Sequence, residues 1–131
     1  MELCAQEQSI LVVDSDPAEL AKTATVLESA GYRVIRAGGF SDARRRLDTA
    51  PPSLLLTGVQ LGAYNGLHLI LRRRATRPQM AAILTHHAFD PVLQCEAENN
   101  QAAFLLKPCT PAALLDLVAH SLRHPGGATT S

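Results

Sequence analysis

The sequence predicts an α/β protein with one doubly wound parallel sheet, built from five strand–helix units. Short apolar runs alternate with longer amphipathic stretches along nearly the whole chain of 131 residues. The apolar runs are continuous, which is typical of strands that are covered by helices on both faces. A chain of this length is expected to fold around one core. The pattern therefore favours a single (βα)₅ domain.

The first strand–helix unit carries the clearest local signals. Residues 10–13 are expected to form a buried strand. Asp16 and Pro17 have the pattern of a helix start, because aspartate is a good N-cap and proline suits the first helical position. Glu19 is expected to complete a capping box with Asp16. Gly31 is expected to end this helix in a left-handed conformation.

The other four units follow the same order. The glycine-rich stretch 58–66 is expected to be a loop, and Ser41 is expected to cap the second helix. A domain is expected over residues 9–123, with an extension at 1–8 and a flexible tail at 124–131. The remaining strands are expected at 34–35, 54–56, 82–84 and 103–106, and the remaining helices at 41–48, 67–74, 91–99 and 110–122.

Composition excludes several classes of partner. The formal net charge is zero, which gives no support to nucleic acid or an anionic membrane as a partner. The basic stretches 44–46 and 72–77 are interpreted as solvated helix faces. The apolar runs are too short to span a bilayer, no signal peptide is evident, and the three cysteines form no paired motif. A cytoplasmic protein is expected.

In open parallel sheets, ligands bind beyond the carboxyl ends of the strands. The residues at those ends resemble the receiver domain of bacterial two-component response regulators. The resemblance extends over residues 9–123 and implies the strand order 2-1-3-4-5 and a role in phosphorelay signalling. It is carried by ILVVDSDP at 10–17, LLLTGVQLGAYNGL at 54–67, ILT at 83–85 and FLLKP at 104–108.

A working receiver holds Mg²⁺ with two acidic residues after the first strand and one aspartate after the third, and that aspartate accepts a phosphoryl group. In this resemblance, Asp14 matches the first acidic position and Thr85 the hydroxyl position. Phe104 matches the aromatic of the last strand, either packed or switching, and Lys107 matches the lysine that follows it. These four residues indicate a site of receiver type.

Other positions depart from the receiver pattern. Ser15 stands where the second acidic residue is implied, and Gly58 stands where the phosphate acceptor is implied. Gly62 replaces a proline, Asn65 replaces an aspartate, and Asn100 replaces a glycine whose left-handed conformation asparagine can adopt. Because several positions differ together, natural degeneration explains Gly58 better than an engineered replacement does.

These substitutions predict a site without phosphorylation chemistry. No acyl phosphate can form at Gly58, because glycine has no side chain. Asp14 and Lys107 are expected to pair with each other, which removes most of the field that would attract a cation. Mg²⁺ binding is therefore expected to be lost or very weak, no other cofactor is expected, and the chain is not expected to be an enzyme.

Two functions from different classes follow. The first is a phosphorylation-independent pseudo-receiver that binds a protein partner or a second copy of itself, through the face of the fourth helix, fifth strand and fifth helix. The alternative is a sensor of an anion or small molecule in the cleft expected beside Gly58, Thr85, His86 and Lys107. A metal site at His86 and His87, or a nucleophilic Cys109, is disfavoured because no further ligand or activating group is evident.

Overall fold

The structure is a computed structural model that describes residues 8–124. Its main sheet is parallel, with the strand order β2-β1-β3-β6-β7. The predicted fold class and strand order are confirmed. The strands of this sheet are β1 (Ser9–Val13), β2 (Arg33–Ala37), β3 (Leu54–Gly58), β6 (Ala81–His86) and β7 (Ala103–Leu106), and the helices are α1 (Pro17–Ser29), α2 (Phe40–Thr49), α3 (Leu67–Thr76), α4 (Pro91–Asn99) and α5 (Pro111–Arg123).

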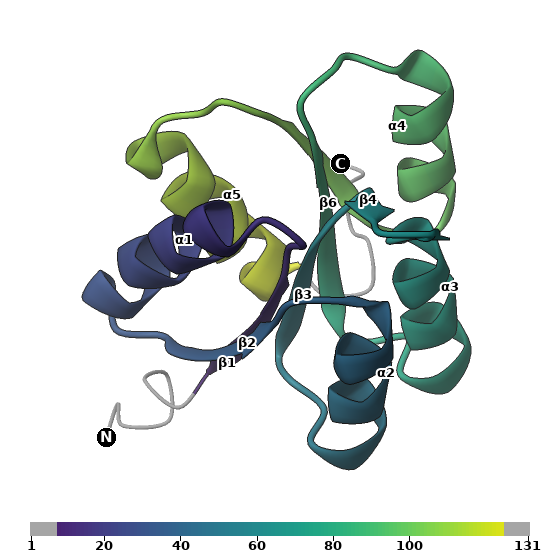
Figure 1. Cartoon of the computed structure of the whole chain (residues 1–131), viewed down its shortest axis with the longest axis horizontal. Helices are drawn as coiled ribbons and strands as arrows, with labels where there is room; N and C mark the ends of the chain where they lie inside the picture. The colour runs from purple at the N-terminus through teal and green to yellow at the C-terminus, as the bar shows by residue number, and fades with distance from the viewer. Residues whose placement is uncertain (1–7, 125–131) are drawn as a thin grey trace.

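Helices cover both faces of the sheet and create two cores (Figure 1). Helices α1 and α5 lie on one face, and α2, α3 and α4 lie on the other. Because successive strand residues point to opposite faces, Leu11 and Leu55 enter the core beneath α2–α4, whereas Ile10 and Leu54 enter the core beneath α1 and α5. All four side chains are fully buried, and each such burial contributes roughly 1.5–3 kcal/mol.

The start of α1 confirms one prediction and overturns another. A carboxylate oxygen of Asp16 accepts from the backbone N–H of Ala18 at 2.9 Å, so Asp16 is the N-cap. The capping box is not formed, because the N–H of Asp16 donates to the Asp14 carboxylate at 2.9 Å and the Glu19 carboxylate pairs with Lys107. Beyond the end of α1, Gly31 has the expected left-handed conformation, with φ +99°.

The predicted cap of α2 is wrong, and the left-handed position after α4 is not Asn100. Helix α2 begins at Phe40 with Gly39 as its N-cap and no side-chain capping bond, so Ser41 is not a cap. The left-handed residue after α4 is Gln101, with φ +55°, whereas Asn100 has φ −108°. The side-chain amide of Asn100 instead donates back to the Glu96 carbonyl at 2.8 Å, which holds Asn100 as the helix C-cap.

The predicted loop after β3 contains a small antiparallel hairpin. Its strands are β4 (Gln60–Leu61) and β5 (Tyr64–Asn65). Gly62 starts the turn with φ +66°, a conformation that favours glycine. The ring of Tyr64 stacks on Phe40 with a centroid distance of 4.7 Å, which joins the hairpin to the start of α2.

None of the helices within residues 8–124 has the length and apolarity that crossing a bilayer requires.

Candidate functional site

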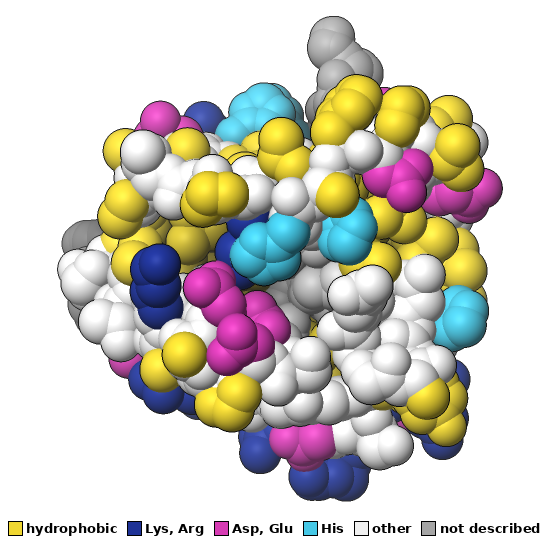
Figure 2. Space-filling view, turned by 45° about the horizontal axis from the view of Figure 1, so that its top comes forward, with side chains coloured by type: hydrophobic (Ala, Val, Ile, Leu, Met, Phe, Trp, Pro, Cys, Tyr) yellow, Lys and Arg dark blue, Asp and Glu magenta, His cyan; other side chains and the backbone are white. Residues whose placement is uncertain are grey.

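The site expected from the sequence lies at the carboxyl edge of the sheet. Asp14 follows β1, Gly58 ends β3, Thr85 is near the end of β6, and Lys107 follows β7. Gly58 and Thr85 are register partners on adjacent strands. Seen from this edge, basic, acidic and histidine side chains gather near the centre of the surface (Figure 2). The parallel sheet therefore brings the four segments together, as the sequence predicts.

Lys107 makes two ion pairs at this edge. Its Nζ atom lies 3.0 Å from Oε1 of Glu19 and 3.7 Å from Oδ2 of Asp14. The expected Asp14–Lys107 pair is present, but Glu19 is the closer partner and was not predicted as a site residue. Its position one turn into α1, next to the edge where β1 ends, is the signal that could have identified it.

The ion pair changes the protonation of Glu19. A hydrogen bond from Lys107, together with the attraction between their charges, lowers the pKa of the Glu19 carboxyl. The side chain of Lys107 is only 13% exposed, so solvent screens these pairs less than pairs on the open surface. Glu19 is therefore ionised near neutral pH and competes with Asp14 for the same ammonium.

Ser15 forms a link across the site. Its hydroxyl donates to the backbone carbonyl of Gln60 at 3.2 Å. Ser15 lies in the loop between β1 and α1, and Gln60 lies in the hairpin after β3. The serine thus joins two loops that meet at the carboxyl edge.

Gly58 is not required by the backbone or by packing. A Cβ atom at this position would lie 3.8 Å from Thr85 Oγ1 and 3.8 Å from the Val13 carbonyl oxygen, which is ordinary contact. Gly66 differs, because a Cβ there would lie 1.9 Å from the Gly58 carbonyl oxygen. Its N–H donates to the Val59 carbonyl at 2.7 Å, so the chain folds back tightly against the end of β3. Glycine is therefore needed at position 66, because the chain there approaches the end of β3 too closely for a side chain. Position 58, in contrast, could hold a larger residue.

Thr85 and Phe104 lie in the interior. The Thr85 hydroxyl donates to the backbone carbonyl of Thr57 at 3.4 Å, on the adjacent strand β3. This bond follows from the register of β3 and β6, in which Gly58 is the partner of Thr85. Phe104 is half-buried and packs against the core beneath α2–α4.

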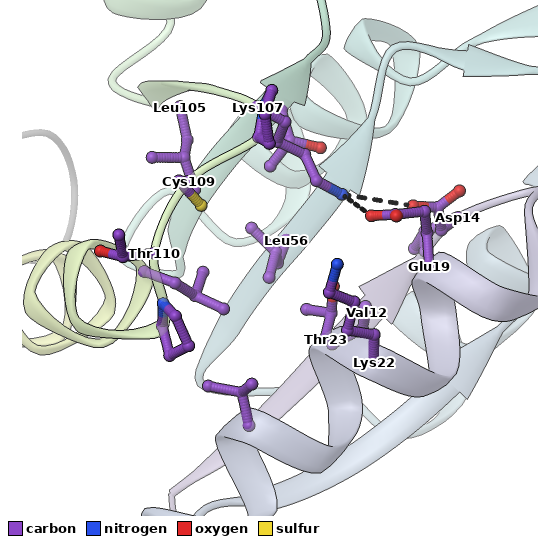
Figure 3. A pocket seen from close by; sticks show the side chains of 16 residues that line it. Val12, Asp14, Glu19, Lys22, Thr23, Leu56, Leu105, Lys107, Cys109 and Thr110 are labelled. Carbon is purple, nitrogen blue, oxygen red and sulfur yellow. Dashed lines mark ion pairs between the residues drawn. The ribbon is translucent and has the colours of Figure 1, made fainter.

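A cavity of about 90 Å³ opens between α1, α5 and the sheet. Thr85 and Lys107 of the expected cleft line it, together with Asp14 and Glu19, whereas Gly58 and His86 do not. Figure 3 shows Lys107 reaching towards Asp14 and Glu19 at one end of the cavity, with Cys109 on the α5 side. The space at this edge therefore lies further towards α1 and α5 than the sequence suggested.

The histidines following β6 are separated by exposure. His86 is half-buried and His87 is exposed. The backbone carbonyl of His86 accepts from the N–H of Lys107 at 2.8 Å, which fixes the segment that carries the lysine. Among residues 8–124, no cluster of three or more histidine, cysteine, aspartate or glutamate side chains is arranged to hold a metal ion.

The basic stretch at the end of α3 is not uniformly solvated. Arg73 is 1% exposed, and one of its guanidinium nitrogens donates to the carbonyls of Asn100 at 2.8 Å and Gln101 at 3.3 Å. Burial lowers the pKa of Arg73 to about 10. The expected solvated face is therefore wrong for Arg73, because its side chain reaches the carbonyls that end α4. Arg72, by contrast, pairs with Asp48 at 2.7 Å on the surface.

Known proteins share this sequence and fold. Residues 10–119 match the family described as the response regulator receiver domain. The transcriptional regulatory protein GlrR of Escherichia coli (strain K12) is 27% identical over 121 residues, which cover 92% of this chain but only 27% of that protein. An uncharacterized 14.6 kDa protein of Leptolyngbya boryana is 32% identical over 117 residues, covering 86% of this chain and 88% of that protein.

Structural similarity agrees with the family match. A CheY-like response regulator receiver domain protein from Methanospirillum hungatei has a TM-score of 0.85 at 27% identity, covering 89% of this chain and 94% of that chain. Its likeness extends over nearly all of the domain that carries the edge described above. The chain therefore belongs to the response regulator receiver domain family.

Proposed function

We propose that this receiver domain acts without phosphorylation at position 58, as a module that binds a protein partner or a second copy of itself. The observation that carries the proposal is Gly58, which ends β3 and offers no side-chain oxygen to a phosphoryl group. Because a Cβ would fit there at 3.8 Å from its nearest neighbours, the glycine is not a requirement of the fold. In this proposal the glycine leaves the domain without a phosphate acceptor at position 58. The chain then has no catalytic role.

The side chains at the edge fit a Mg²⁺ site poorly. Mg²⁺ prefers several oxygen ligands in octahedral geometry. The Asp14 carboxylate accepts from the N–H of Asp16 at 2.9 Å and lies 3.7 Å from Lys107. The hydroxyl of Ser15 is used by the Gln60 carbonyl. We propose that the domain works without this ion.

Glu19 adds to this argument. Asp14, Glu19 and Lys107 together carry a net charge of −1, and the ammonium lies within 4 Å of both carboxylates. A divalent cation would have to displace Lys107 from both partners, at a cost that the poor screening in a half-buried site increases. The ammonium of Lys107 thus partly neutralises the two carboxylates, as a bound cation would.

The proposed partner surface is the face formed by α4, β7 and α5. Large apolar side chains are exposed at this face. Phe89, just before α4, is 66% exposed, Val92 in the first turn of α4 is 73% exposed, and Leu106 at the end of β7 is 44% exposed. Figure 2 shows hydrophobic and acidic side chains together over the α4 corner, at upper right. Exposed aromatic and aliphatic groups beside polar ones are typical of protein contact sites. A homodimer or a signalling protein would cover them.

We propose residues 9–123 as the functional domain. The extension and most of the tail that the sequence suggested, residues 1–7 and 125–131, lie outside the described residues. Receiver domains take part in signalling by contacting other proteins, and this chain spans only about a quarter of GlrR. The output module and the pathway therefore belong to proteins or segments other than the domain described.

The chemical part of the proposal can be tested directly. The protein is incubated with Mg²⁺ and either acetyl phosphate or beryllofluoride, and is followed by intact-mass spectrometry and amide NMR. We expect no phosphoryl adduct and no saturable shifts at Asp14, Thr85 or Lys107. An adduct, or saturable shifts at those residues, would overturn the proposal.

The interaction face has its own test. Sedimentation velocity over a range of concentrations is compared for the wild type, Val92→Glu on α4 and Leu71→Glu on α3. Leu71 is a matched control because it is also an exposed helical hydrophobe, at 41%. Self-association that Val92→Glu removes and Leu71→Glu retains supports a homodimer through this face. A wild type that stays monomeric at all concentrations rules the homodimer out.

A further inference from the structure

The cavity between α1, α5 and the sheet has an apolar interior. Its floor is made of strand side chains from β1, β3 and β7, namely Val12, Leu56 and Leu105, and its walls include Val26 of α1 and Leu114 of α5. An apolar cavity of about 150 Å³ can hold a benzene-sized molecule. The volume here, about 90 Å³, is about three fifths of that and therefore encloses roughly four carbon atoms of an apolar chain.

Four charged groups also line this apolar space, namely Asp14, Glu19, Lys22 and Lys107. Figure 3 shows Lys107, Asp14 and Glu19 gathered on one side, with Lys22 below them beside Thr23 and Val12, and Leu56 near the centre of the view. A site with an apolar body and a few polar groups is typical of small-molecule binding. The lining suits an amphiphile whose charged head remains beside these charged groups.

The ion pairs decide the sign of that head. Both carboxylates already have Lys107 within 4 Å. Lys22, in contrast, takes part in none of the ion pairs found within residues 8–124. A cationic head would have to displace Lys107, whereas an anionic head would find Lys22, whose ammonium makes no ion pair within 4 Å there and contributes only a minor attraction to Glu19. Lys22 is exposed, so solvent partly screens such a pair.

We propose that this cavity binds a small monocarboxylic acid with a short apolar body, its carboxylate paired with Lys22. The acyl chain lies on Leu56 and Leu105, between Val26 and Leu114. Such a ligand contacts α1, α5 and the end of β7 at once, and its carboxylate also lies near the Lys107–Glu19 pair. The site goes beyond the proposed interaction role, because it uses neither Gly58 nor a metal.

The test is an amide NMR titration of the whole chain with hexanoate. Hexan-1-ol and hexylamine, which have the same chain with neutral and cationic heads, are the ligand controls. We expect saturable shifts at Val12, Leu56, Leu105 and Leu114, with hexanoate binding roughly fivefold more tightly than either control, as expected for one partly screened ion pair. No saturable shifts with hexanoate, or equal affinity for hexan-1-ol, would overturn the proposal.

Three variants separate the contribution of the carboxylate head to binding from that of the apolar body. Lys22→Gln is expected to weaken hexanoate roughly fivefold and to leave hexan-1-ol unchanged. Val26→Phe is expected to fill the cavity and abolish binding of both, and Cys109→Leu does the same from the α5 side if Val26→Phe misfolds. Arg33→Gln, an exposed cation on β2 outside the cavity, should bind like the wild type. Hexanoate shifts that persist in both filled variants would place the ligand elsewhere.

The hexanoate titration and the phosphorylation test can fail independently of each other. The hexanoate titration contains no Mg²⁺, phosphodonor or beryllofluoride, and its readout is at residues of the cavity floor. A chain that ignores hexanoate can still be a pseudo-receiver, and a chain that is phosphorylated can still bind hexanoate.

Discussion

The ammonium of Lys107 lies 3.0 Å from a carboxylate oxygen of Glu19, closer than the 3.7 Å that separates it from Asp14. This pair joins the first turn of α1 to the segment after β7. The backbone of Lys107 is fixed as well, because its N–H donates to the His86 carbonyl. The lysine that could face a phosphoryl group is thus engaged by carboxylates of its own chain.

We expect Glu19→Gln to reduce the free energy of unfolding by about 0.5 kcal/mol at pH 7, a value typical of an ion pair that solvent partly screens. The Lys107 ammonium lowers the pKa of Glu19 in the folded state below its ordinary value of 4.5. The contribution is therefore present above pH 4.5 and is lost as the pH falls through the lower, folded-state pKa. Urea unfolding of both proteins between pH 7 and pH 3 measures it.

The control for this experiment is Glu96→Gln, an exposed glutamate on α4. It should track the wild type at every pH. A difference between wild type and Glu19→Gln that stays constant down to pH 3 would mean that packing, and not the charge of Glu19, is responsible.

Arg73→Ala is expected to destabilise the fold by roughly 2–4 kcal/mol, through a cavity and two unpaired carbonyls. Arg73 donates to the carbonyls of Asn100 and Gln101 at the end of α4. Amide exchange should accelerate most at Ala102, whose N–H donates to the Ala97 carbonyl beside that contact. Denaturant unfolding and hydrogen exchange measure both effects.

Arg74→Ala is the matched control for Arg73. Arg74 also donates to the end of α4, at the Asn99 carbonyl at 2.8 Å, but it is exposed. Its loss should cost less than about 1 kcal/mol. Equal costs for the two variants would show that burial of the Arg73 guanidinium contributes nothing special.

Alanine at four glycines should give a graded series of stabilities. Gly66→Ala should cost about 3 kcal/mol or more, because the new Cβ would lie 1.9 Å from a carbonyl oxygen. Gly62→Ala should cost about 1 kcal/mol, because of its φ of +66°. Gly58→Ala and the control Gly38→Ala should be nearly neutral, since nothing obstructs either Cβ. Thermal unfolding ranks them, and a large loss for Gly58→Ala would contradict the space found at that position.

Restoring the missing carboxylates should restore receiver chemistry. The variant with both Ser15→Asp and Gly58→Asp adds two carboxylates, which with Asp14 make the three that the receiver pattern implies. We expect it to gain a phosphoryl adduct with acetyl phosphate and Mg²⁺, seen by intact mass. Ser15→Asp alone should gain none. A double variant that remains unmodified although it folds would mean that the Glu19–Lys107 pair blocks the site, and adding Glu19→Gln should then release it.

The fold was largely predictable because its signals are local. The buried run at 10–13 and the Asp16 cap act over a few residues, so periodicity and capping placed five strand–helix units in the correct order. The hairpin after β3 was missed because each of its strands is two residues long, too short to show any period.

The site was predictable in position but not in its contacts. That Asp14, Gly58, Thr85 and Lys107 lie at one edge follows from parallel strands whose carboxyl ends meet. The pair of Lys107 with Asp14 was predicted, but the closer pair with Glu19 was not, since Glu19 had a local alternative in the capping box. Both arrangements satisfy its carboxylate, and only the approach of α1 to the end of β7 makes the ion pair the closer one.

The sequence alone determined the five units, the edge where their strands end and the presence of a glycine, which has no side-chain carboxylate, at position 58. Tertiary structure alone decided that Arg73, one of three successive arginines, is buried against the end of α4, and that a cavity remains between α1 and α5. The physical reason is the distance along the chain over which each interaction acts. Hydrogen bonds of caps and periodic apolar faces are satisfied within one element, whereas a buried guanidinium or an empty volume depends on how elements distant in the chain pack together.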